Sequence, residues 1–213
     1  MQTPQDIVSL IALSMGAAWA SGINLYATIF MLGIMGSSGG ILLPEGLQIL
    51  TNPAVIAAAG LMFMVEFCAD KVPGLDSAWD AVHTFIRIPA GIMLAANAVG
   101  PVDPAAQMAA AIIGGVLTTG SHAAKSGTRL IANTSPEPFT NWALSIGEDI
   151  AVFVGIWAAL QHPYLFLAAL VLFVGLMIWF LPILFRGLAR IFGWFRKMFS
   201  SRKNELSEGQ SAE

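Results

Sequence analysis

The sequence predicts an all-α, polytopic integral membrane protein, a helix bundle of about six transmembrane helices. Of its 213 residues, 56% are hydrophobic and 11% are charged, whereas a soluble domain carries roughly 45–50% apolar and about 25% charged residues. At ~20 residues per span, the length suits about six spans. This composition excludes an ordinary soluble enzyme, a disordered chain and a nucleic-acid-binding protein, which needs a basic surface. The single cysteine, Cys68, excludes a disulfide framework.

The first three apolar segments are separated by turn-forming residues. Residues 7–44 contain no Asp, Glu, Lys, Arg or His and give one span with a Gly/Ser-rich exit. The second segment, 53–67, begins with a proline, which suits the first turn of a helix because the missing N–H costs nothing there. The third, 88–102, makes only ~22 Å of helix. It therefore needs the preceding turn, 82–87, to cross a core of about 30 Å.

The last three segments are bounded by prolines. The fourth segment, 105–124, follows two prolines, and helical spacing extends it toward Asn133 before two more prolines end it. The fifth, 139–160, carries two acidic residues inside an apolar run. A His-Pro turn separates it from the sixth, 164–185. Together these segments form a predicted transmembrane domain over residues 1–185.

Residues 186–213 form a separate basic tail. They contain six basic and three acidic residues, whereas residues 1–185 contain four basic and ten acidic ones. Aromatic and aliphatic residues recur at helical spacing between the tail's cations. The tail is therefore predicted to be an amphipathic segment on the inner leaflet, drawn to anionic lipid and disordered at its end.

With six spans, all ten Lys and Arg residues sort to one side of the membrane. Loops 37–52, 101–104 and 161–163 contain no Lys or Arg, and all ten lie in or near the other loops and the tail. Basic residues are enriched in cytoplasmic loops, so both termini are predicted to be cytoplasmic. Five or seven spans would break this sorting.

The first and fourth segments share a pattern at a constant offset of 98 residues. The matching runs are Gly16-x4-Ser21-Gly22-x-Asn24 and Gly114-x4-Thr119-Gly120-x-His122. If three spans repeat as three, the second copy is inverted, which is a recurring plan of transporters with the site at the repeat interface. The alternative is chance similarity between helices rich in small residues, because the offset fails beyond the first span of each half.

The densest polar stretch of the sequence supplies six candidate site residues. Glu66 and Asp70 are four apart and share a helix face, and Glu66 lies inside an apolar run, where an ionisable residue is a functional candidate. A second face carries four more: Asp76, Asp80, His83 and Arg87. The plainer interpretation of this second face is an amphipathic interfacial helix whose charges lie in water.

Cations and acids recur in the fourth and fifth segments. His122, Lys125 and Arg129 form one stripe on a helix, which is expected to face the bundle interior because a cation on a lipid face is expensive. The alternative is that the two cations snorkel to the inner surface. Glu148 and Asp149 point about 100° apart on a helix. One of them is expected to pair with Lys125 or Arg129 and the other to line a cavity, the alternative being a purely structural ion pair.

Other polar residues give weaker signals. Asn24 is either a hydrogen-bonded link between helices or a ligand. Asp70, Asp76 and Asp80 are able to hold Mg²⁺ against a lipid phosphate, but their spacing is not specific, so a metal ligand set stays undefined. The sequence lacks the H-E-x-x-H, G-x-S-x-G and phosphate-loop motifs. No cofactor is predicted, and an enzymatic role is not expected.

Three motifs resemble those of the family called domain of unknown function 4126. They are Glu66-x3-Asp70-Lys71-Val72-Pro73-x2-Asp76-x2-Trp79-Asp80-x2-His83-Thr84, His122-x2-Lys125-x3-Arg129, and Glu148-Asp149. The resemblance covers about residues 7–162, so the sixth segment and the basic tail fall outside it. It implies a small protein of the bacterial inner membrane and supports the choice of residues. It implies no substrate and no reaction.

Three functions fit these observations. The first is a small transporter or channel for an ion, a small solute or a lipid, with a site built from intramembrane carboxylates and the cationic stripe. The second is a membrane scaffold or assembly protein whose charges only hold helices together. The third is a Mg²⁺-dependent enzyme acting on lipid phosphates, with His83 as general base. The lipid bilayer is the expected partner, and homo-oligomerisation is left open. The candidate binding residues are Asn24, Glu66, Asp70, Asp76, Asp80, His83, Arg87, His122, Lys125, Arg129, Glu148 and Asp149.

The six-span arrangement makes a direct topological prediction. Reporter domains fused at Gly40 and at the C-terminus should report opposite sides of the membrane, because an odd number of spans separates the two points. In inside-out vesicles the membrane is inverted, so the fusion that is accessible in intact cells should become protected and the other should become accessible. Two fusions that report the same side would show that the layout is wrong.

Overall fold

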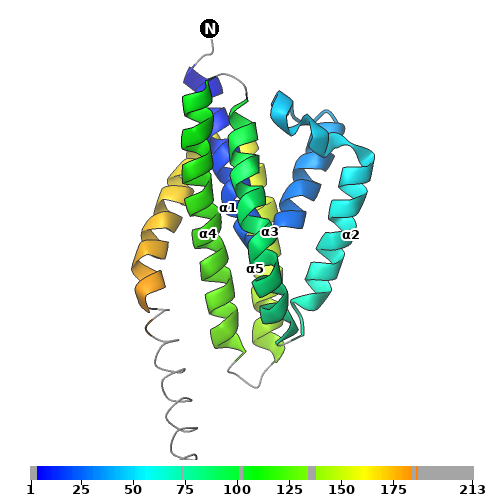
Figure 1. The fold of residues 1–213 in the computed structure, drawn as a ribbon, viewed down its shortest axis with the longest axis vertical. Coiled ribbons are helices and arrows are strands. Elements are labelled where there is room, and N and C mark those ends of the chain that lie inside the picture. The colour runs from blue at the N-terminus through cyan, green and yellow to red at the C-terminus, as the bar shows by residue number, and fades with distance from the viewer. Residues whose placement is uncertain (1–3, 73, 101–102, 134–137, 184–185, 187–213) are drawn as a thin grey trace, which may run out of the picture. The chain divides into compact units, whose positions relative to one another are not determined.

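The computed structural model describes residues 4–72, 74–100, 103–133, 138–183 and 186, and all regular structure in these ranges is helical. The helices are α1 (Pro4–Ser37), the 3-10 helix η1 (Glu45–Thr51), α2 (Pro53–Ala69), α3 (Leu75–Val99), α4 (Pro104–Ala132) and α5 (Pro138–Gln161), followed by Pro163–Ile183. The all-α prediction is confirmed (Figure 1). The predicted amphipathic tail after residue 186 lies outside the described residues.

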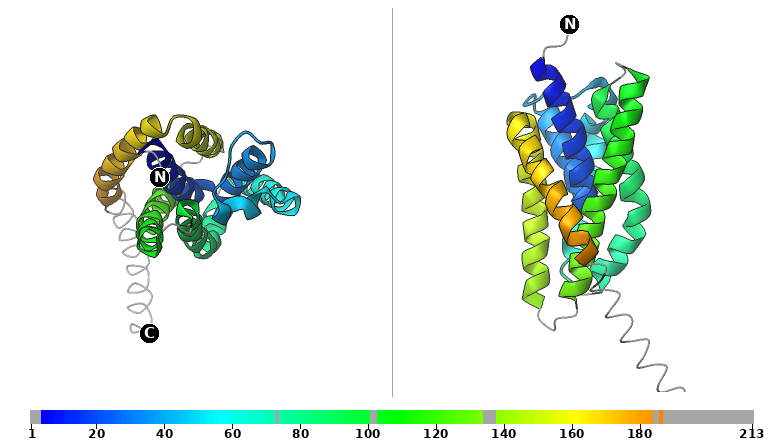
Figure 2. Two further views of the ribbon diagram at one scale, coloured as in Figure 1. Left: turned by 90° about the horizontal axis from the view of Figure 1, so that it is seen from above. Right: turned by 90° about the vertical axis from the view of Figure 1, so that its left-hand side faces the viewer.

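The chain divides into two units, residues 1–177 and 178–213. The described part of the second unit is helical at 178–183. The first unit is arranged around α1, which contacts η1 and α2 to α5, and Figure 2 shows it among the other helices. Small residues on α1, among them Ala12, Ala17 and Ala20, are fully buried and let the neighbouring backbones approach closely.

Helix α1 is broken at Asn24. Asn24 has extended backbone angles, φ −147° and ψ 100°, so the helical hydrogen bonds stop there and restart. Its side-chain Oδ1 accepts a hydrogen bond from the backbone N–H of Ala27 at 2.9 Å, which caps the second half of the helix. The sequence predicts one continuous span here, and the structure instead has two half-helices joined at a polar residue.

Helix α3 also differs from the prediction. The sequence predicts a third span at 88–102 that is extended back to residue 82, with an interfacial helix as the plainer interpretation of the charges between 76 and 87, but Leu75–Val99 is one helix with Pro89 inside it. Asp76, Asp80 and Arg87 on this helix are at most 1% exposed. The interpretation that these charges lie in water is therefore wrong, because charged side chains of α2 and α4 pair with them.

Over the ranges that the structure describes, six helices lie at the six predicted apolar segments, and four of them are long and apolar enough to cross a membrane. These four are α1, α3, α5 and Pro163–Ile183; a fifth span results if η1 and α2, which meet at 70°, count as one. Helix α4 is the longest after α1, but polar side chains, including His122, Lys125 and Arg129, lower its hydropathy. The six-span count and the inverted repeat stay predictions.

Hydroxyl groups join α1, α3 and α4 where small residues bring the backbones together. Thr118 donates to the carbonyl of Ala18 at 2.8 Å, Ser121 to that of Trp19 at 2.9 Å, and Ser14 to that of Ala95 at 2.8 Å. Such bonds to main-chain carbonyls are a common link between membrane helices. They require backbones that nearly touch.

Replacing Gly22 with alanine should destabilise this contact. An added Cβ would collide with the Ser121 hydroxyl and the Thr118 carbonyl on α4. Overpacking of this kind costs about 1–3 kcal/mol, to be measured as the loss in free energy of unfolding of the purified protein. Gly147→Ala on α5 is the matched control, since no atom lies within 4 Å of its added Cβ and alanine favours a helix by about 1 kcal/mol. Equal losses in the two variants would contradict the close packing of α1 on α4.

Candidate functional site: a buried ion-pair network

Eight charged side chains from four helices and the turn after α2 form a network of nine ion pairs, called here the ion-pair network. Its carboxylates come from α2, the residue after α2, α3 and α5, and its cations from α3 and α4. Its members are Glu66, Asp70, Asp76, Asp80, Arg87, Lys125, Arg129 and Glu148. All but Glu148 have side chains at most 2% exposed. The predicted stripe on α4 therefore faces inward, and the snorkelling alternative is wrong.

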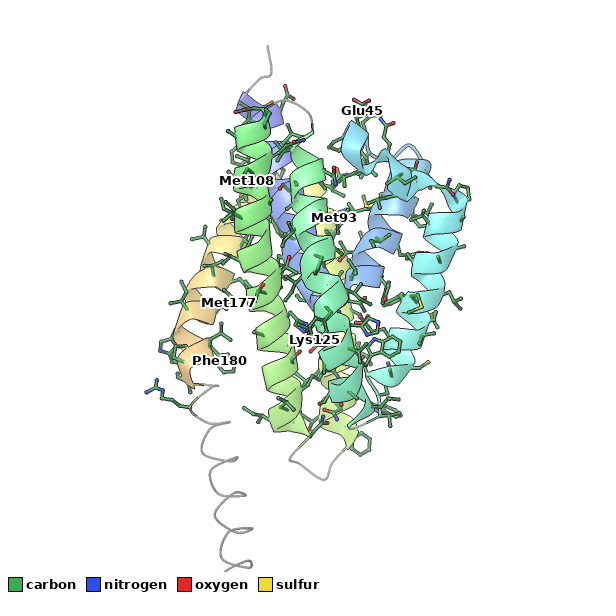
Figure 3. All side chains as sticks on the ribbon, in the orientation of Figure 1. Glu45, Met93, Met108, Lys125, Met177 and Phe180 are labelled. Carbon is green, nitrogen blue, oxygen red and sulfur yellow. The ribbon has the colours of Figure 1, made fainter. Side chains whose placement is uncertain are left out.

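Lys125 lies at the middle of the ion-pair network (labelled in Figure 3). Five oxygen atoms from four helices and an adjoining turn surround its ammonium. They are Ile23 O at 3.0 Å, Glu66 Oε1 at 3.1 Å, Asp70 Oδ2 at 3.2 Å, Asp80 Oδ1 at 3.7 Å and Glu148 Oε2 at 3.8 Å. The Ile23 carbonyl immediately precedes the break in α1, so Lys125 connects the network to that break.

The two arginines hold opposite sides of the network. Arg87 donates to Glu66 at 2.6 Å and to Asp80 at 2.8 Å, so it joins α3 to α2. Arg129 donates to Glu148 at 2.6 Å and to Asp70 at 3.1 Å, so it joins α4 to α5 and to the turn after α2. Charge-assisted bonds of these lengths are among the stronger ones in proteins.

The two histidines lie differently. Nδ1 of His122 is 3.3 Å from Nη1 of Arg87 and Nε2 is 2.6 Å from the hydroxyl of Thr84, so His122 borders the network as predicted. His83 instead lies 2.9 Å from the carbonyl of Trp79 and stacks on the Trp79 ring, with centroids 4.1 Å apart. The structure therefore places His83 beside the network without an ion pair to it.

Asp76 and Asp70 complete the network on the side of Arg129. Asp76 accepts two hydrogen bonds from Asn133, at 2.9 and 3.1 Å, and Asn133 also accepts from Asn141. Asp70 lies in the turn after α2, where burial raises the pKa of its carboxyl above its ordinary value; Lys125 and Arg129 oppose this effect. Asn141 was missed by sequence reasoning, although 141, 145 and 149 recur every four residues and define a polar face of α5.

Glu148 and Asp149 diverge, as their adjacency on a helix predicts. Glu148 pairs with Arg129 and also lines a cavity of about 400 Å³ with Lys125, Trp19 and Phe173. Asp149 does not line this cavity; its Oδ1 accepts from Asn24 Nδ2 at 3.0 Å. The expected pairing of one acid with Arg129 is confirmed, and the cavity described here is lined by that same acid, because the packing of α5 on α1 buries Asp149 and leaves the Glu148 side chain 17% exposed.

Carboxylates outnumber cations in this region. Counted together with Asp149, which makes no ion pair, this region contains six carboxylates against three buried cations, Lys71 nearby being only half-buried. Three buried carboxylate oxygens, Glu66 Oε2, Asp70 Oδ1 and Asp149 Oδ2, accept no hydrogen bond. An uncompensated charge in a dry interior is costly, so this surplus calls for bound protons or small cations.

The predicted aspartate set for Mg²⁺ does not assemble. Asp70, Asp76 and Asp80 are held by Lys125, Asn133 and Arg87 respectively. Within the part of the chain that the structure describes, no group of three His, Cys, Asp or Glu residues is arranged to hold a metal ion. The geometry thus gives the magnesium hypothesis no support.

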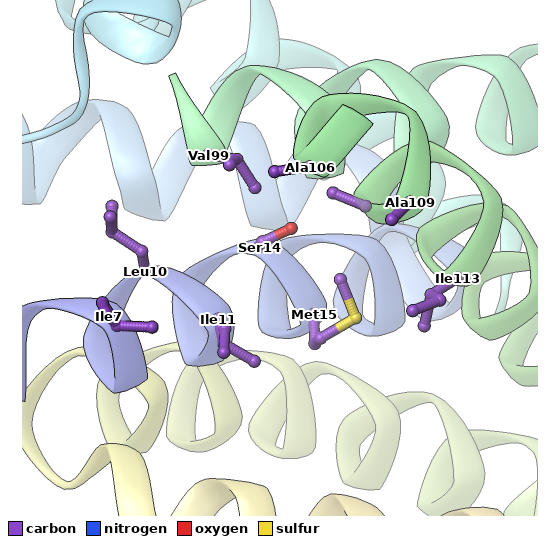
Figure 4. Close-up of a pocket in the computed structure, with 10 residues that line it drawn as sticks. Ile7, Leu10, Ile11, Ser14, Met15, Val99, Ala106, Ala109 and Ile113 are labelled. Carbon is purple, nitrogen blue, oxygen red and sulfur yellow. The ribbon is translucent and has the colours of Figure 1, made fainter. Parts of the chain in front are cut away.

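A second cavity, of about 440 Å³, is apolar (Figure 4). It is lined by Ile7, Ile11 and Met15 of α1 and by Ala109 and Ile113 of α4, among others. No charged side chain reaches it. It is therefore separate from the ion-pair network.

An all-α bundle with at least four helices apolar enough to cross a membrane, and with charges buried among them, defines a protein of the helical membrane class. The chain belongs to the family described as Domain of unknown function (DUF4126), whose model matches residues 11–183. The match includes Pro163–Ile183, so the expectation that the sixth segment falls outside the family is wrong; the tail from 186 is outside the match. No curated protein and no solved structure matches the sequence.

Removing the central ammonium should strongly destabilise the bundle. Lys125→Met leaves several carboxylates without a partner, and breaking a buried pair costs ~3–5 kcal/mol, measured as a loss in free energy of unfolding. Adding Glu66→Gln should restore part of this loss, whereas adding Asp149→Asn should restore less, because Asp149 makes no ion pair with Lys125. Lys71→Met is the control: Lys71 is half-buried over the Phe67 ring and makes none of the nine ion pairs, and its loss should cost about 1 kcal/mol. Equal recovery in both double variants would show that only total charge matters.

Proposed function

We propose that the protein is a small transporter or channel of a bacterial cytoplasmic membrane, and that the ion-pair network is its site. The observation that carries this proposal is the surplus of buried carboxylates over cations. In a purely structural network, carboxylates in excess of the cations do not add to folding stability, because each adds a desolvation cost that no cation offsets. Ionisable groups at membrane depth commonly mark ion and proton pathways. The transported species is an ion, a small solute or a lipid.

The break in α1 supports the same proposal. Discontinuous helices near the middle of a bundle place free backbone carbonyls and helix termini at the binding sites of many transporters. Here the break exposes the Ile23 carbonyl to the ammonium of Lys125. We include in the proposal six spans with both termini in the cytoplasm, and the inverted relation between α1–α3 and the three helices that follow.

Exchange of partners around Lys125 provides the mechanism. Its ammonium has near partners in Glu66 and Asp70 and slightly more distant ones in Asp80 and Glu148, 3.7 and 3.8 Å away. A proton or cation that neutralises one near carboxylate would release Lys125 toward another. Because these acids lie on different helices, such an exchange would shift the helices relative to each other and alternate access to the site.

A scaffold or assembly role is the second candidate, and the tight pairing favours it. Arg87 and Glu66 are completely buried and 2.6 Å apart, which is the geometry of a fixed structural link. Such a protein would bind one partner in a constant ratio and move no ion. The charge surplus is the feature that this role leaves unexplained.

Flux measurements separate the two roles. Full-length protein in liposomes should dissipate an imposed gradient of H⁺, Na⁺ or K⁺, or move a fluorescent phospholipid between leaflets, faster than empty liposomes. Glu148→Gln should lower that rate about tenfold, equivalent to ~1.4 kcal/mol in a barrier, because Glu148 is the network acid that reaches a cavity. Glu45→Gln, the same change at an exposed position of η1, should leave the rate unchanged.

The opposite result is equally clear. If folded protein moves none of these species and instead copurifies with one partner in a fixed ratio, the transport proposal is overturned in favour of the scaffold. A rate that falls equally in Glu148→Gln and Glu45→Gln would show that the ion-pair network is not the site.

A further inference from the structure

We infer that Asp149 is a proton-binding site that controls the break in α1 through Asn24. The inference rests on the proposed transport role, which it deepens by naming the ligand, the residue that holds it and the helix that responds. Nothing in the pattern of the sequence separates Asp149 from Glu148. The distinction comes from where α5 packs.

Asp149 is the one carboxylate of the six, among the described residues, that makes no ion pair. Its side chain is buried, with 7% of the residue exposed, yet its hydrogen-bond partner is a neutral amide, Asn24 Nδ2. The second oxygen, Oδ2, is buried and accepts no hydrogen bond. A carboxylate in this setting is stabilised far less than its paired neighbours, so it is the acid of the network best placed to take up a proton.

A second buried group points to the same ligand. Ser145 lies four residues before Asp149, on the same face of α5, and it is fully buried. Its hydroxyl has no hydrogen-bond partner, and leaving a buried polar group unsatisfied is costly. A proton on Asp149 Oδ2 would turn this unpaired acceptor into a hydrogen-bond donor. The hydroxyl oxygen of Ser145, on the same face of α5, is available to accept that bond.

Asn24 connects this proton site to the backbone of α1. Its Nδ2 donates to Asp149, and its Oδ1 accepts from the N–H of Ala27 and so caps the second half-helix. A single amide therefore fixes both the start of the half-helix and its link to α5. Protonation takes a proton from water, forms the Oδ2–H bond and removes the charge that strengthens the Asn24 bond. The cap then loses the contact that fixes its orientation.

Several charged groups act on Asp149 from the elements around it. Lys125 on α4 favours the carboxylate, and so does Lys71 in the turn after α2, whereas Asp70 and Glu66 favour the protonated acid. Helix α1 has no Asp, Glu, Lys, Arg or His between Ile7 and its end. Its one phenol, Tyr26, packs edge-on against the His83 ring, and Asn24 is the α1 side chain that bonds to Asp149. Any exchange of partners by Lys125 therefore changes the charge around Asp149, which links the proton site to the ion-pair network.

Infrared difference spectroscopy of the full-length protein across a pH series tests the assignment. A carboxylic-acid carbonyl band should grow as pH falls and should lose one component in Asp149→Asn, which is a neutral isostere of the protonated acid. Glu148→Gln, one residue away and paired with Arg129, should retain that component. Asn24→Ala keeps the acid but removes its donor, so the component should persist to higher pH, an increase of about tenfold in proton affinity. This variant decides the question if Asp149→Asn does not fold.

Hydrogen exchange at the Ala27 amide tests the link to α1. In the unaltered protein, its protection relative to the intrinsic rate should fall as the acid band grows, and in Asp149→Asn it should stay low at every pH. If protection of the Ala27 amide does not change over the pH range in which the acid band grows, the proposed coupling of Asp149 to α1 is overturned. If the titration of the acid band shifts when choline replaces Na⁺ or K⁺, the site binds a metal cation, and its assignment as a proton site is overturned.

The two proposals fail separately. If the infrared band loses its component in Asp149→Asn and protection of the Ala27 amide follows pH, but liposomes show no flux, Asp149 is a proton-dependent switch and the transport role is overturned. If flux occurs and the band keeps every component in Asp149→Asn, transport stands and this inference is overturned.

Discussion

Arg87, Lys125 and Arg129 lie inside a bundle whose helices are otherwise largely apolar, so each cation has to be met by carboxylates of neighbouring helices. Removing a charge from water costs several kcal/mol, and the cost is recovered only when opposite charges lie at hydrogen-bonding distance. This requirement fixes where α2, α3, α4 and α5 lie relative to each other. Glu66 is shared by Arg87 and Lys125, and Asp70 by Lys125 and Arg129. The network therefore acts as one unit rather than as separate pairs.

The rest of the first unit is adapted to this constraint. Helix α1 carries no cation of its own, but it supplies the small residues that let α3 and α4 approach and the Ile23 carbonyl that Lys125 binds. That carbonyl is available because Asn24 interrupts the helix. Without the break, the carbonyl of Ile23 would bond to an amide one turn later, and the ammonium of Lys125 would have one oxygen fewer.

The network also shows a balance between stability and function. Its paired members, such as Arg87 and Glu66, are completely buried and suit a rigid support. Glu148 and Asp149 differ from them, because the first reaches a cavity and the second has no cation. Both lie on α5, which also packs on α1. Proton or ion exchange in the proposed function would therefore begin at α5 and reach the other helices through Lys125 and Asn24.

The sequence by itself determined the helical class, the six segments and nearly all residues of the site, because hydropathy and helical spacing are local properties of the chain. The motif from Glu66 to Arg87 and the stripe from His122 to Arg129 were recognisable for that reason, and the family match agrees with them. Only the tertiary structure decided which cation meets which acid, that 75–99 is one helix, that α1 breaks at Asn24, and that His83 stacks on Trp79. These outcomes depend on how each helix is rotated and placed against helices distant in sequence. Adjacent residues such as Glu148 and Asp149 therefore receive different partners, and no spacing along one helix encodes the difference.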